Sequence, residues 1–412
     1  MKGLKGNAIV GQSGGPTTAI NASLAGVVGQ AKKSELIETI YGTVNGVVGI
    51  LNDNIVNMSE IMKTDEDIDI LKHTPASYLR TCRYKLPTAA EEPETYKKIF
   101  ERFEQYNIKY FFYIGGNDSM DTVMKVSNYA KEIGYEINVI GVPKTVDNDL
   151  LITDHTPGFG SAAKYIATSI SELMHDCDVY DIDSVNIVEI MGRNAGWMTA
   201  SSALARRQPG DAPHLIYLPE VPFKVEQFIE DIKRANKIKR NVIVAVSEGC
   251  KTPDGKYVCE SVGTGAVDAF GHKKLSGAGR ALEEIVKEHF PTFRTRVIEF
   301  SLLQRCAMHF ASKTDVDESE MIGQAGVRAA ENGETGMMMI YVREPGKDYK
   351  VSISSYDINK IANGEKKIPD EWITENGTNV SEELLDYMRP LVVGEPKLHY
   401  KDGLPLYAQL DK

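Results

Sequence analysis

One stretch near the start, Ala8-Ile9-Val10-Gly11-Gln12-Ser13-Gly14-Gly15-Pro16, joins an apolar run directly to a glycine-rich turn. An alanine-rich segment with helical spacing follows from about Thr18, so the order is strand, turn, helix. The same order recurs where Tyr110 to Ile114 runs into Gly115-Gly116-Asn117-Asp118-Ser119 and then into a helical segment that ends near Ile133. Buried strands that alternate with helices are typical of a parallel α/β sheet.

Three more apolar runs end in polar turns, and all lie between residues 137 and 249. The turns are Pro143-Lys144-Thr145-Val146-Asp147-Asn148-Asp149, Met191-Gly192-Arg193 and Ser247-Glu248-Gly249. These units are too many for one sheet, so we predict an α/β fold with two doubly wound, Rossmann-like domains and mostly parallel sheets. Ligands of such folds bind at the carboxyl ends of the strands, which makes the polar residues of these turns the candidate site.

Length and charge narrow the function classes. At about 150 residues per domain, 412 residues predict two or three domains. The chain carries 47 Lys and Arg against 58 Asp and Glu, a net charge of -11, which argues against nucleic acid or an anionic membrane as the partner. No run approaches the roughly 18 apolar residues of a membrane span, and residues 1–6 lack the apolar stretch typical of a signal peptide. The five cysteines form no CxxC pair, so we expect reduced thiols in a cytoplasmic protein.

The glycine-rich turns can hold an anion. Backbone N–H groups and a helix N-terminus around Gly14 and Gly15 suit a phosphate, although a tight turn with a Thr cap would explain the same residues. In the second turn, Asp118 could ligate Mg²⁺ or cap the helix, and Asn117 offers an amide oxygen to a hard cation.

The run 145–149 is the most informative of the turns. Asp147 could accept a proton as a general base, and Asp149 could orient an Arg or a metal-bound water; a solvated acidic loop is the alternative. Guanidinium groups match phosphate bidentately, and several arginines lie in or near the turns. They are Arg80, Arg83, Arg193, Arg206, Arg207, Arg294, Arg296 and Arg305.

Together these turns resemble the phosphofructokinase family, over roughly three quarters of the chain from Gly11 to about Arg305. One short match would be weak, but five motifs occur in the family's order with compatible spacing. They are Gly14-Gly15 with Asn21-Ala22, Gly115-Gly116-Asn117-Asp118-Ser119, Pro143-Lys144-Thr145-Val146-Asp147-Asn148-Asp149, Met191-Gly192-Arg193, and Gln304-Arg305.

The resemblance implies a role for each matching residue. Asp147 is similar to the base that takes the proton from the 1-hydroxyl of fructose 6-phosphate, and Arg193 to the arginine that also steadies the moving phosphoryl group. Lys144 joins them as a catalytic and donor-binding residue. The other donor residues implied are Gly14, Gly15, Arg83, Gly116, Asp118 and Ser119, with Asn117 and Asp118 on the Mg²⁺ side. The acceptor residues implied are Thr145, Asp147, Asp149, Met191, Gly192, Arg193, Glu248, Arg296 and Arg305.

Three departures from the usual ATP-dependent pattern bear on the donor and the assembly. Asp118 and Lys144 stand where that pattern has Gly, and both resemble the pyrophosphate-dependent branch. Asn117 replaces the usual metal-side Asp. Ser184 replaces an Arg that bacterial ATP enzymes lend across a subunit interface, and Leu302 replaces a substrate-contacting His.

The resemblance therefore implies an Mg²⁺-dependent phosphotransferase acting on fructose 6-phosphate and pyrophosphate, forming a homodimer or homotetramer. ATP dependence is the first alternative, and a non-catalytic sugar-phosphate-binding regulatory subunit is the second. We expect residues 1–158, completed by about 304–355, to form the donor domain. Residues 159–303, completed by about 356–412, are expected to form the fructose 6-phosphate domain.

Overall fold

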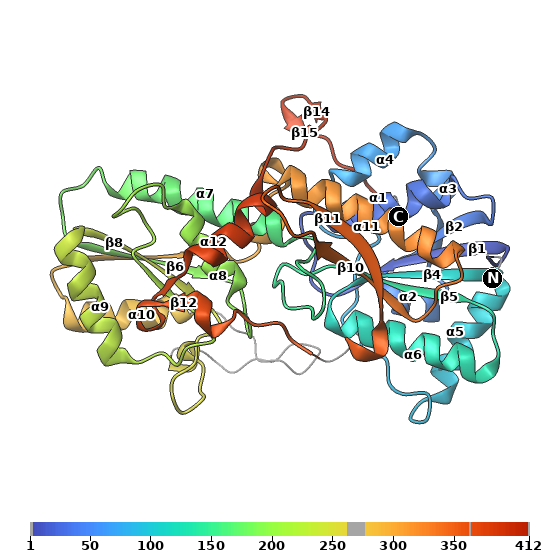
Figure 1. The fold of residues 1–412 in the computed structure, drawn as a ribbon, viewed down its shortest axis with the longest axis horizontal. Helices are drawn as coiled ribbons and strands as arrows, with labels where there is room; N and C mark the ends of the chain where they lie inside the picture. The colour runs from blue at the N-terminus through green and yellow to red at the C-terminus, as the bar shows by residue number, and fades with distance from the viewer. Residues whose placement is uncertain (1–2, 262–276, 362–363, 411–412) are drawn as a thin grey trace.

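The computed structural model of the chain describes residues 3–261, 277–361 and 364–410. Two α/β units lie side by side, each a mostly parallel sheet with helices on both faces (Figure 1). The prediction of two doubly wound sheets is confirmed. No helix in the described ranges is both long and apolar enough to cross a membrane.

The first unit holds a sheet of seven described strands, in which the two outermost pairings, β10–β11 and β2–β3, are antiparallel. Its central strands are buried on both faces, as parallel strands covered by helices must be. In spatial order the strands are β11 (Val351–Asp357), β10 (Met337–Arg343), β5 (Asn138–Pro143), β4 (Ile108–Gly115), β1 (Gly6–Gln12), β2 (Ile37–Thr43) and β3 (Ile55–Asn57).

Helices cover both faces of this sheet and bury two separate cores. Ala8 and Val10 of β1 face the side of α1 and α11, whereas Ile9 faces the side of α5 and α6. The helices of this unit are α1 (Ile20–Ala31), α2 (Gly46–Leu51), α3 (Met58–Ile61), α4 (Asp65–Lys72), α5 (Pro93–Gln105), α6 (Asn117–Ile133) and α11 (Lys313–Glu331).

Helix α11 comes from the last hundred residues yet packs directly on α1 (Figure 1). The two backbones meet at glycines: a Cβ on Gly26 would lie 2.1 Å from the Glu320 carbonyl oxygen, and one on Gly323 would lie 2.2 Å from the Ser23 carbonyl oxygen. No larger side chain fits this crossing. The crossing ties the C-terminal part of the chain to the first unit.

The second unit holds four described strands, all parallel, and its helices again lie on both faces. Val188 and Ile190 of β6 face α7, α8 and α12, whereas Val185 and Ile187 face α9 and α10. The strands, in spatial order, are β7 (Leu215–Tyr217), β8 (Asn241–Ser247), β6 (Ser184–Ile190) and β9 (Arg294–Glu299). The helices are α7 (Phe159–Cys177), α8 (Trp197–Ser201), α9 (Val225–Ile238), α10 (Ala278–His289) and α12 (Glu382–Met388).

The C-terminal region touches both units. Ile368, Leu384 and Met388 join the core on α7, while Ala408 and Leu410 return to the core of the first unit. The region also contains two short hairpins, β12 (Ile373–Thr374) with β13 (Asn379–Val380) and β14 (Tyr400–Lys401) with β15 (Leu404–Pro405). The second hairpin stands away from the body of the molecule (Figure 1).

In each sheet one of the polar turns follows the strand at which the strand order reverses. Strand β1 has β2 on one side and β4 on the other, and β6 has β8 on one side and β9 on the other. Neighbouring crossovers leave such a point on opposite faces of the sheet, so a crevice opens there at the carboxyl ends.

Candidate active site

A cavity of about 330 Å³ lies where the carboxyl ends of the two sheets face each other. It is lined by turns from both units, so neither unit forms it alone. The predicted site residues that line it are Gly14, Gly15, Arg83, Gly116, Asn117, Asp118, Ser119, Lys144, Thr145, Asp147, Asp149, Met191, Arg193, Glu248 and Arg305.

Lys144 ties the donor-side turns together. Its backbone N–H donates to the Gly115 carbonyl oxygen at 2.9 Å, and its ammonium donates to the carbonyl oxygens of Ser13 at 2.9 Å and Gly15 at 2.7 Å. An ammonium carries three donors, so a third can reach a ligand in the cavity. Burial lowers the pKa of Lys144 to about 7, opposed by the negative charge of Asp147. An anionic ligand would restore the ammonium form.

Asp147 sits on the irregular loop between β5 and α7 and faces the cavity. Its backbone N–H donates to Oγ1 of Thr145 at 3.1 Å, which fixes the turn that carries the carboxylate. Burial raises the pKa of Asp147, although Lys144 and Arg193 oppose the shift. A carboxylate with a raised pKa is a stronger proton acceptor than a solvated one, which suits a general base.

Asp149 and Glu248 add two more half-buried carboxyl groups to the same cavity. Burial raises the pKa of Asp149 to about 7, and the nearby charges of Asp147 and Glu365 add to the shift. Burial also raises the pKa of Glu248 to about 7, with Asp147 as the next contribution. The acids repel one another, so a cation or a ligand hydroxyl would stabilise this arrangement.

Asn117 and Asp118 open helix α6 beside this acid group. The Asn117 side-chain amide donates to Oδ2 of Asp149 at 3.3 Å, and its buried Oδ1 has no hydrogen-bond partner among the described residues. Asp118 is exposed, lines the cavity and does not cap α6, because the N-cap residue is Gly116. The capping alternative for Asp118 is therefore wrong.

The oxygen donors around α6 fit a magnesium ion. In residues 3–261, 277–361 and 364–410 no three His, Cys, Asp or Glu side chains converge on one metal position. Mg²⁺ does not need such a group, since it keeps several waters and binds through one or two carboxylates together with substrate phosphates. The unpartnered Asn117 oxygen and the Asp118 carboxylate match that requirement.

The acceptor side is built on the turns after β6 and β8. The Ser247 hydroxyl donates to the Gly192 carbonyl oxygen at 2.6 Å, and the Gly192 N–H donates to Oε1 of Glu248 at 3.4 Å. The Met191 N–H donates to Oε1 of Gln304 at 3.3 Å. Gly192 does not line the cavity itself; it braces Glu248 beside it.

Arg305 reaches across from the acceptor side to the first glycine turn. It ends a short 3-10 helix, Leu303–Arg305, and a methyl group on Gly15 would lie 3.1 Å from its Nη1. Burial lowers the pKa of Arg305, and the charge of Arg83 adds to that shift, so the two guanidinium groups lie near each other. Two neighbouring guanidinium groups in one cavity favour a ligand with phosphate groups.

Comparison with known proteins identifies this architecture. A family model described as phosphofructokinase matches residues 7–317. The chain belongs to the phosphofructokinase family.

Three similar proteins align with most or nearly all of this phosphofructokinase chain. It is 38% identical to a pyrophosphate–fructose 6-phosphate 1-phosphotransferase of Halomonas elongata, over 98% of this chain and 96% of the relative. It is also 32% identical to a sulfofructose kinase of Alkalicoccus urumqiensis, over 89% of this chain and 91% of that one. The crystal structure of a pyrophosphate-dependent phosphofructokinase from Nitrosospira multiformis has a TM-score of 0.89 and 37% identity, covering 98% of this chain and 96% of that one.

Arg296 does not line the cavity of this phosphofructokinase. It lies on edge strand β9 opposite Asn186, four residues before β6 ends, and so far from the carboxyl end that carries the site. Its charge acts instead on Cys177: burial raises the pKa of that thiol, and Arg296 opposes the shift. Within one chain, Arg296 is therefore not brought together with Arg305.

Two polar residues of the cavity, Asn194 and Glu365, were not predicted from the sequence. Glu365 lines the cavity, and its Oε1 accepts from the Asn194 side chain at 2.7 Å. Asn194 directly follows the Met-Gly-Arg motif and could have been suspected from that position. Glu365 lies outside every family motif, and no local signal marks it.

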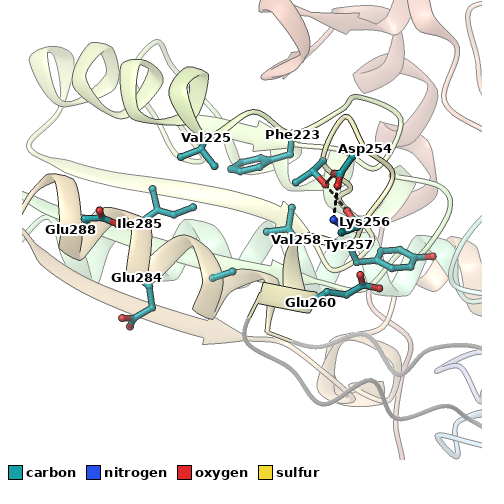
Figure 2. A pocket seen from close by; sticks show the side chains of 12 residues that line it. Phe223, Val225, Asp254, Lys256, Tyr257, Val258, Glu260, Glu284, Ile285 and Glu288 are labelled. Atoms are coloured by element: carbon teal, nitrogen blue, oxygen red, sulfur yellow. Dashed lines mark hydrogen bonds and ion pairs between the residues drawn. The ribbon is translucent and has the colours of Figure 1, made fainter.

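A larger hollow of about 670 Å³ lies in the second unit, away from these turns (Figure 2). Phe223, Val225 and Ile285 give it an apolar wall, and Glu284 and Glu288 lie along one side. The lysine that lines it, Lys256, is paired with Asp254 at 2.8 Å. This lining would repel a phosphate, so the hollow does not compete with the smaller cavity as the site.

Proposed function

We propose that this chain is a pyrophosphate-dependent 6-phosphofructokinase. It transfers a phosphoryl group from pyrophosphate to the 1-hydroxyl of fructose 6-phosphate, giving fructose 1,6-bisphosphate and phosphate, reversibly and within glycolysis. The observation that carries the proposal is one cavity in which half-buried Asp147 lies between a lysine-braced glycine turn and an arginine–glutamate acceptor side. The curated relatives of similar length support it.

On the donor side, pyrophosphate binds against the Gly14-Gly15 turn and the N-terminus of α6. Backbone N–H groups, Ser119 and the Lys144 ammonium neutralise its charge, because a helix N-terminus and a buried cation both favour anions. Arg83 completes this side. Phosphoryl transfer depends mostly on positioning and charge stabilisation, which these groups supply.

On the acceptor side, Asp147 takes the proton from the 1-hydroxyl of the sugar. Arg193 stabilises the charge that spreads over the moving phosphoryl group. Glu248 binds sugar hydroxyls and Arg305 binds the 6-phosphate, while Thr145, Asp149 and Met191 shape the pocket around them.

Magnesium is part of the proposal. Asn117 and Asp118 would hold it, and the ion would neutralise phosphate charge when bound. Pyrophosphate rather than ATP is the donor because Asp118 projects into the cavity where the ATP pattern has Gly, and because Lys144 adds a cation there. The alternative, a non-catalytic regulatory subunit, does not explain why Asp147 and Asp149 are retained, since a subunit that only binds has no need of a base.

The decisive experiment is a coupled assay of the purified protein with fructose 6-phosphate and Mg²⁺, supplied with either pyrophosphate or ATP. We expect turnover with pyrophosphate to exceed turnover with ATP at matched Mg²⁺. A preference for ATP would contradict the donor assignment. The same assay with sulfofructose as acceptor tests whether the acceptor resembles that of the Alkalicoccus urumqiensis relative.

We further propose a cytoplasmic homodimer or homotetramer in which Arg296 serves the site of a second copy. Cys82, Cys177, Cys250 and Cys306 are free thiols, which suits a reducing compartment. Near the amino ends of β6 and β9, Val179 is 70% exposed and Tyr180 is 47% exposed, and Tyr180 packs under Arg294. Such apolar side chains favour burial against a partner.

Coexpression of two inactive variants tests the assembly. If Arg296 crosses to a second copy, Asp147→Asn on one chain and Arg296→Ala on the other fall together in the same site of a mixed dimer. A mixed oligomer then contains one intact site and regains activity. Two variants that stay inactive together, in an oligomer of proven mixed composition, would contradict the assignment of Arg296.

A further inference from the structure

A short piece of the C-terminal region, residues 364–368, runs past both catalytic loops. Within it, Glu365 lines the cavity and is bonded to Asn194 on the acceptor side. Lys366 is the next residue and makes contacts in both directions. No motif pointed to this segment.

Lys366 is bonded to the loop that carries the base. Its backbone N–H donates to the Asp149 carbonyl oxygen at 2.7 Å. Its ammonium donates to the carbonyl oxygens of Asp154 at 2.7 Å and Thr153 at 3.2 Å, and to Oδ1 of Asn148 at 3.4 Å. This loop is not part of a helix or sheet that would supply N–H donors to its carbonyl groups. The Lys366 ammonium supplies those donors instead.

Lys366 is also bonded to the acceptor side. Its carbonyl oxygen accepts from Nε1 of Trp197 at 2.9 Å, and its ammonium lies 5.2 Å from the centre of the Trp197 ring. Trp197 begins α8, four residues after Arg193. One residue therefore contacts both the loop of Asp147 and the helix that follows Arg193.

We propose that Lys366 is a positioning residue for phosphoryl transfer, holding the base-bearing loop against the acceptor loop so that Asp147 and Arg193 meet the same reacting group. The inference rests on the proposed function of the site. Its physical basis is that the two loops belong to different units, so their spacing is not set by either sheet. A misplacement of about 1 Å in such a geometry costs up to about 100-fold in rate.

The loop has a second support, which separates positioning from folding. The Tyr387 hydroxyl donates to the Asp154 carbonyl oxygen at 2.6 Å and accepts from the Asn148 side-chain amide at 2.9 Å. Loss of the Lys366 ammonium therefore leaves the loop tied to the C-terminal region. We expect the loop to shift and the fold to persist.

The test compares Lys366→Met with Lys367→Met, its exposed neighbour, as the matched control. We expect Lys366→Met to lower kcat about 10- to 100-fold while both KM values stay within about threefold. Lys367→Met should behave as wild type. Lys366→Arg keeps the charge and should recover part of kcat, which a loss of packing alone would not predict.

A second measurement asks whether Lys366 acts through Asp147. In an Asp147→Asn background, adding Lys366→Met should lower the residual rate less than about twofold, because the base it positions is already gone. A full additional loss would overturn the proposal, and so would an unchanged kcat in the single variant. Where Lys366→Met fails to fold, Trp197→Phe removes the Nε1 donor and should lower kcat without changing either KM.

The proposed function and the role of Lys366 can be contradicted separately. A wild-type protein without turnover on either donor contradicts the proposed function. An active wild type beside an equally active Lys366→Met variant contradicts only the role of Lys366.

Discussion

The two sides of the cavity recognise their ligands by different means. On the donor side the ligand meets main chain: glycine turns and a helix N-terminus, held in place by the bonds from Lys144 to the carbonyl oxygens of Ser13 and Gly15. On the acceptor side it meets long side chains, Glu248 and Arg305, which extend from turns after separate strands. A compact anion such as pyrophosphate suits main-chain N–H groups, whereas a sugar phosphate needs groups that match hydroxyls and a distant phosphate.

This difference predicts how each side responds to substitution. Changes on the donor side alter the shape of a turn and so affect catalysis with the donor. Changes on the acceptor side remove one contact and so affect acceptor affinity. Asp147, between the two, should affect the rate and little else.

The largest effect is expected from Asp147→Asn. The general base contributes about 10²- to 10⁴-fold, so kcat should fall by that factor while both KM values change less than about threefold. Steady-state kinetics in both directions measure it. Asp181→Asn, which removes an exposed partner of Arg240, is the control. An active Asp147→Asn enzyme would remove the base from the mechanism.

The second-largest effect is expected from Lys144→Met, which should impair catalysis with pyrophosphate and leave acceptor binding unchanged. It removes a charge-assisted phosphate contact and leaves the Ser13 and Gly15 carbonyl groups without their donor, so kcat/KM for pyrophosphate should fall about 100-fold or more. The KM for fructose 6-phosphate should change little. Thermal unfolding of the variant checks that the fold survives. Equal damage to both substrates would mean that the two sides are not separable.

Arg305→Ala should weaken binding of fructose 6-phosphate and leave binding of pyrophosphate unchanged. Loss of one charge-assisted contact costs about 1.5–3 kcal/mol, so the KM for fructose 6-phosphate should rise about 10- to 150-fold. The KM for pyrophosphate should be unaffected. Unchanged acceptor kinetics would count decisively against this placement of Arg305.

Asp118→Gly should have a smaller effect, which is confined to the choice of phosphoryl donor. The carboxylate is exposed, so about 6 Å from a phosphate charge it costs only about 0.7 kcal/mol in water-like surroundings, roughly threefold. Side-chain crowding adds to this, and we expect the ratio of ATP to pyrophosphate turnover to rise about 3- to 10-fold. Competition kinetics at fixed Mg²⁺ measure the ratio. A constant ratio would show that Asp118 does not select the donor.

The smallest effect is expected on stability, at His155, which links the loop after β5 to helix α11. His155 is bonded to Asp154 at 2.9 Å and to Glu318 at 2.8 Å. Burial alone would lower its pKa, but the two carboxylates outweigh burial and raise it. The stability gained is complete below about pH 6.5, the unfolded value, and is lost as pH rises through the higher folded value.

His155→Gln should therefore lower the Tm by more at pH 6 than at pH 9. Thermal unfolding followed by circular dichroism measures the difference between variant and wild type at each pH. A gap that widens with rising pH would contradict the imidazolium assignment.

Much of the fold and of the site could be predicted from local sequence. The strands that precede Gly11, Gly115 and Met191 are apolar runs buried on both faces, and parallel sheets demand such runs. The turn residues after them lie together because the carboxyl ends of parallel strands share one edge. Lys144 and Asp147 share the edge of the first sheet for this reason, whereas Arg193 meets them because the two units face each other.

Other features could not be predicted in this way. Arg296 and Arg305 are nine residues apart and look alike in sequence, yet one lies on β9 and the other beyond its end. Only the strand register separates them. The exposure of Asp118 also depends on how the two units face each other, which no local pattern contains.

The sequence by itself determined which chemical groups the cavity holds, because glycine turns, closely spaced carboxylates and an arginine directly after a strand are local patterns with a direct chemical meaning. Only the tertiary structure decided which residues of the last hundred belong to the site. Glu365 lines the cavity and Lys366 is bonded to the loop that carries Asp147, and long-range contacts of this kind leave no periodic or compositional trace. Their role is set by where the backbone passes, not by their identity alone.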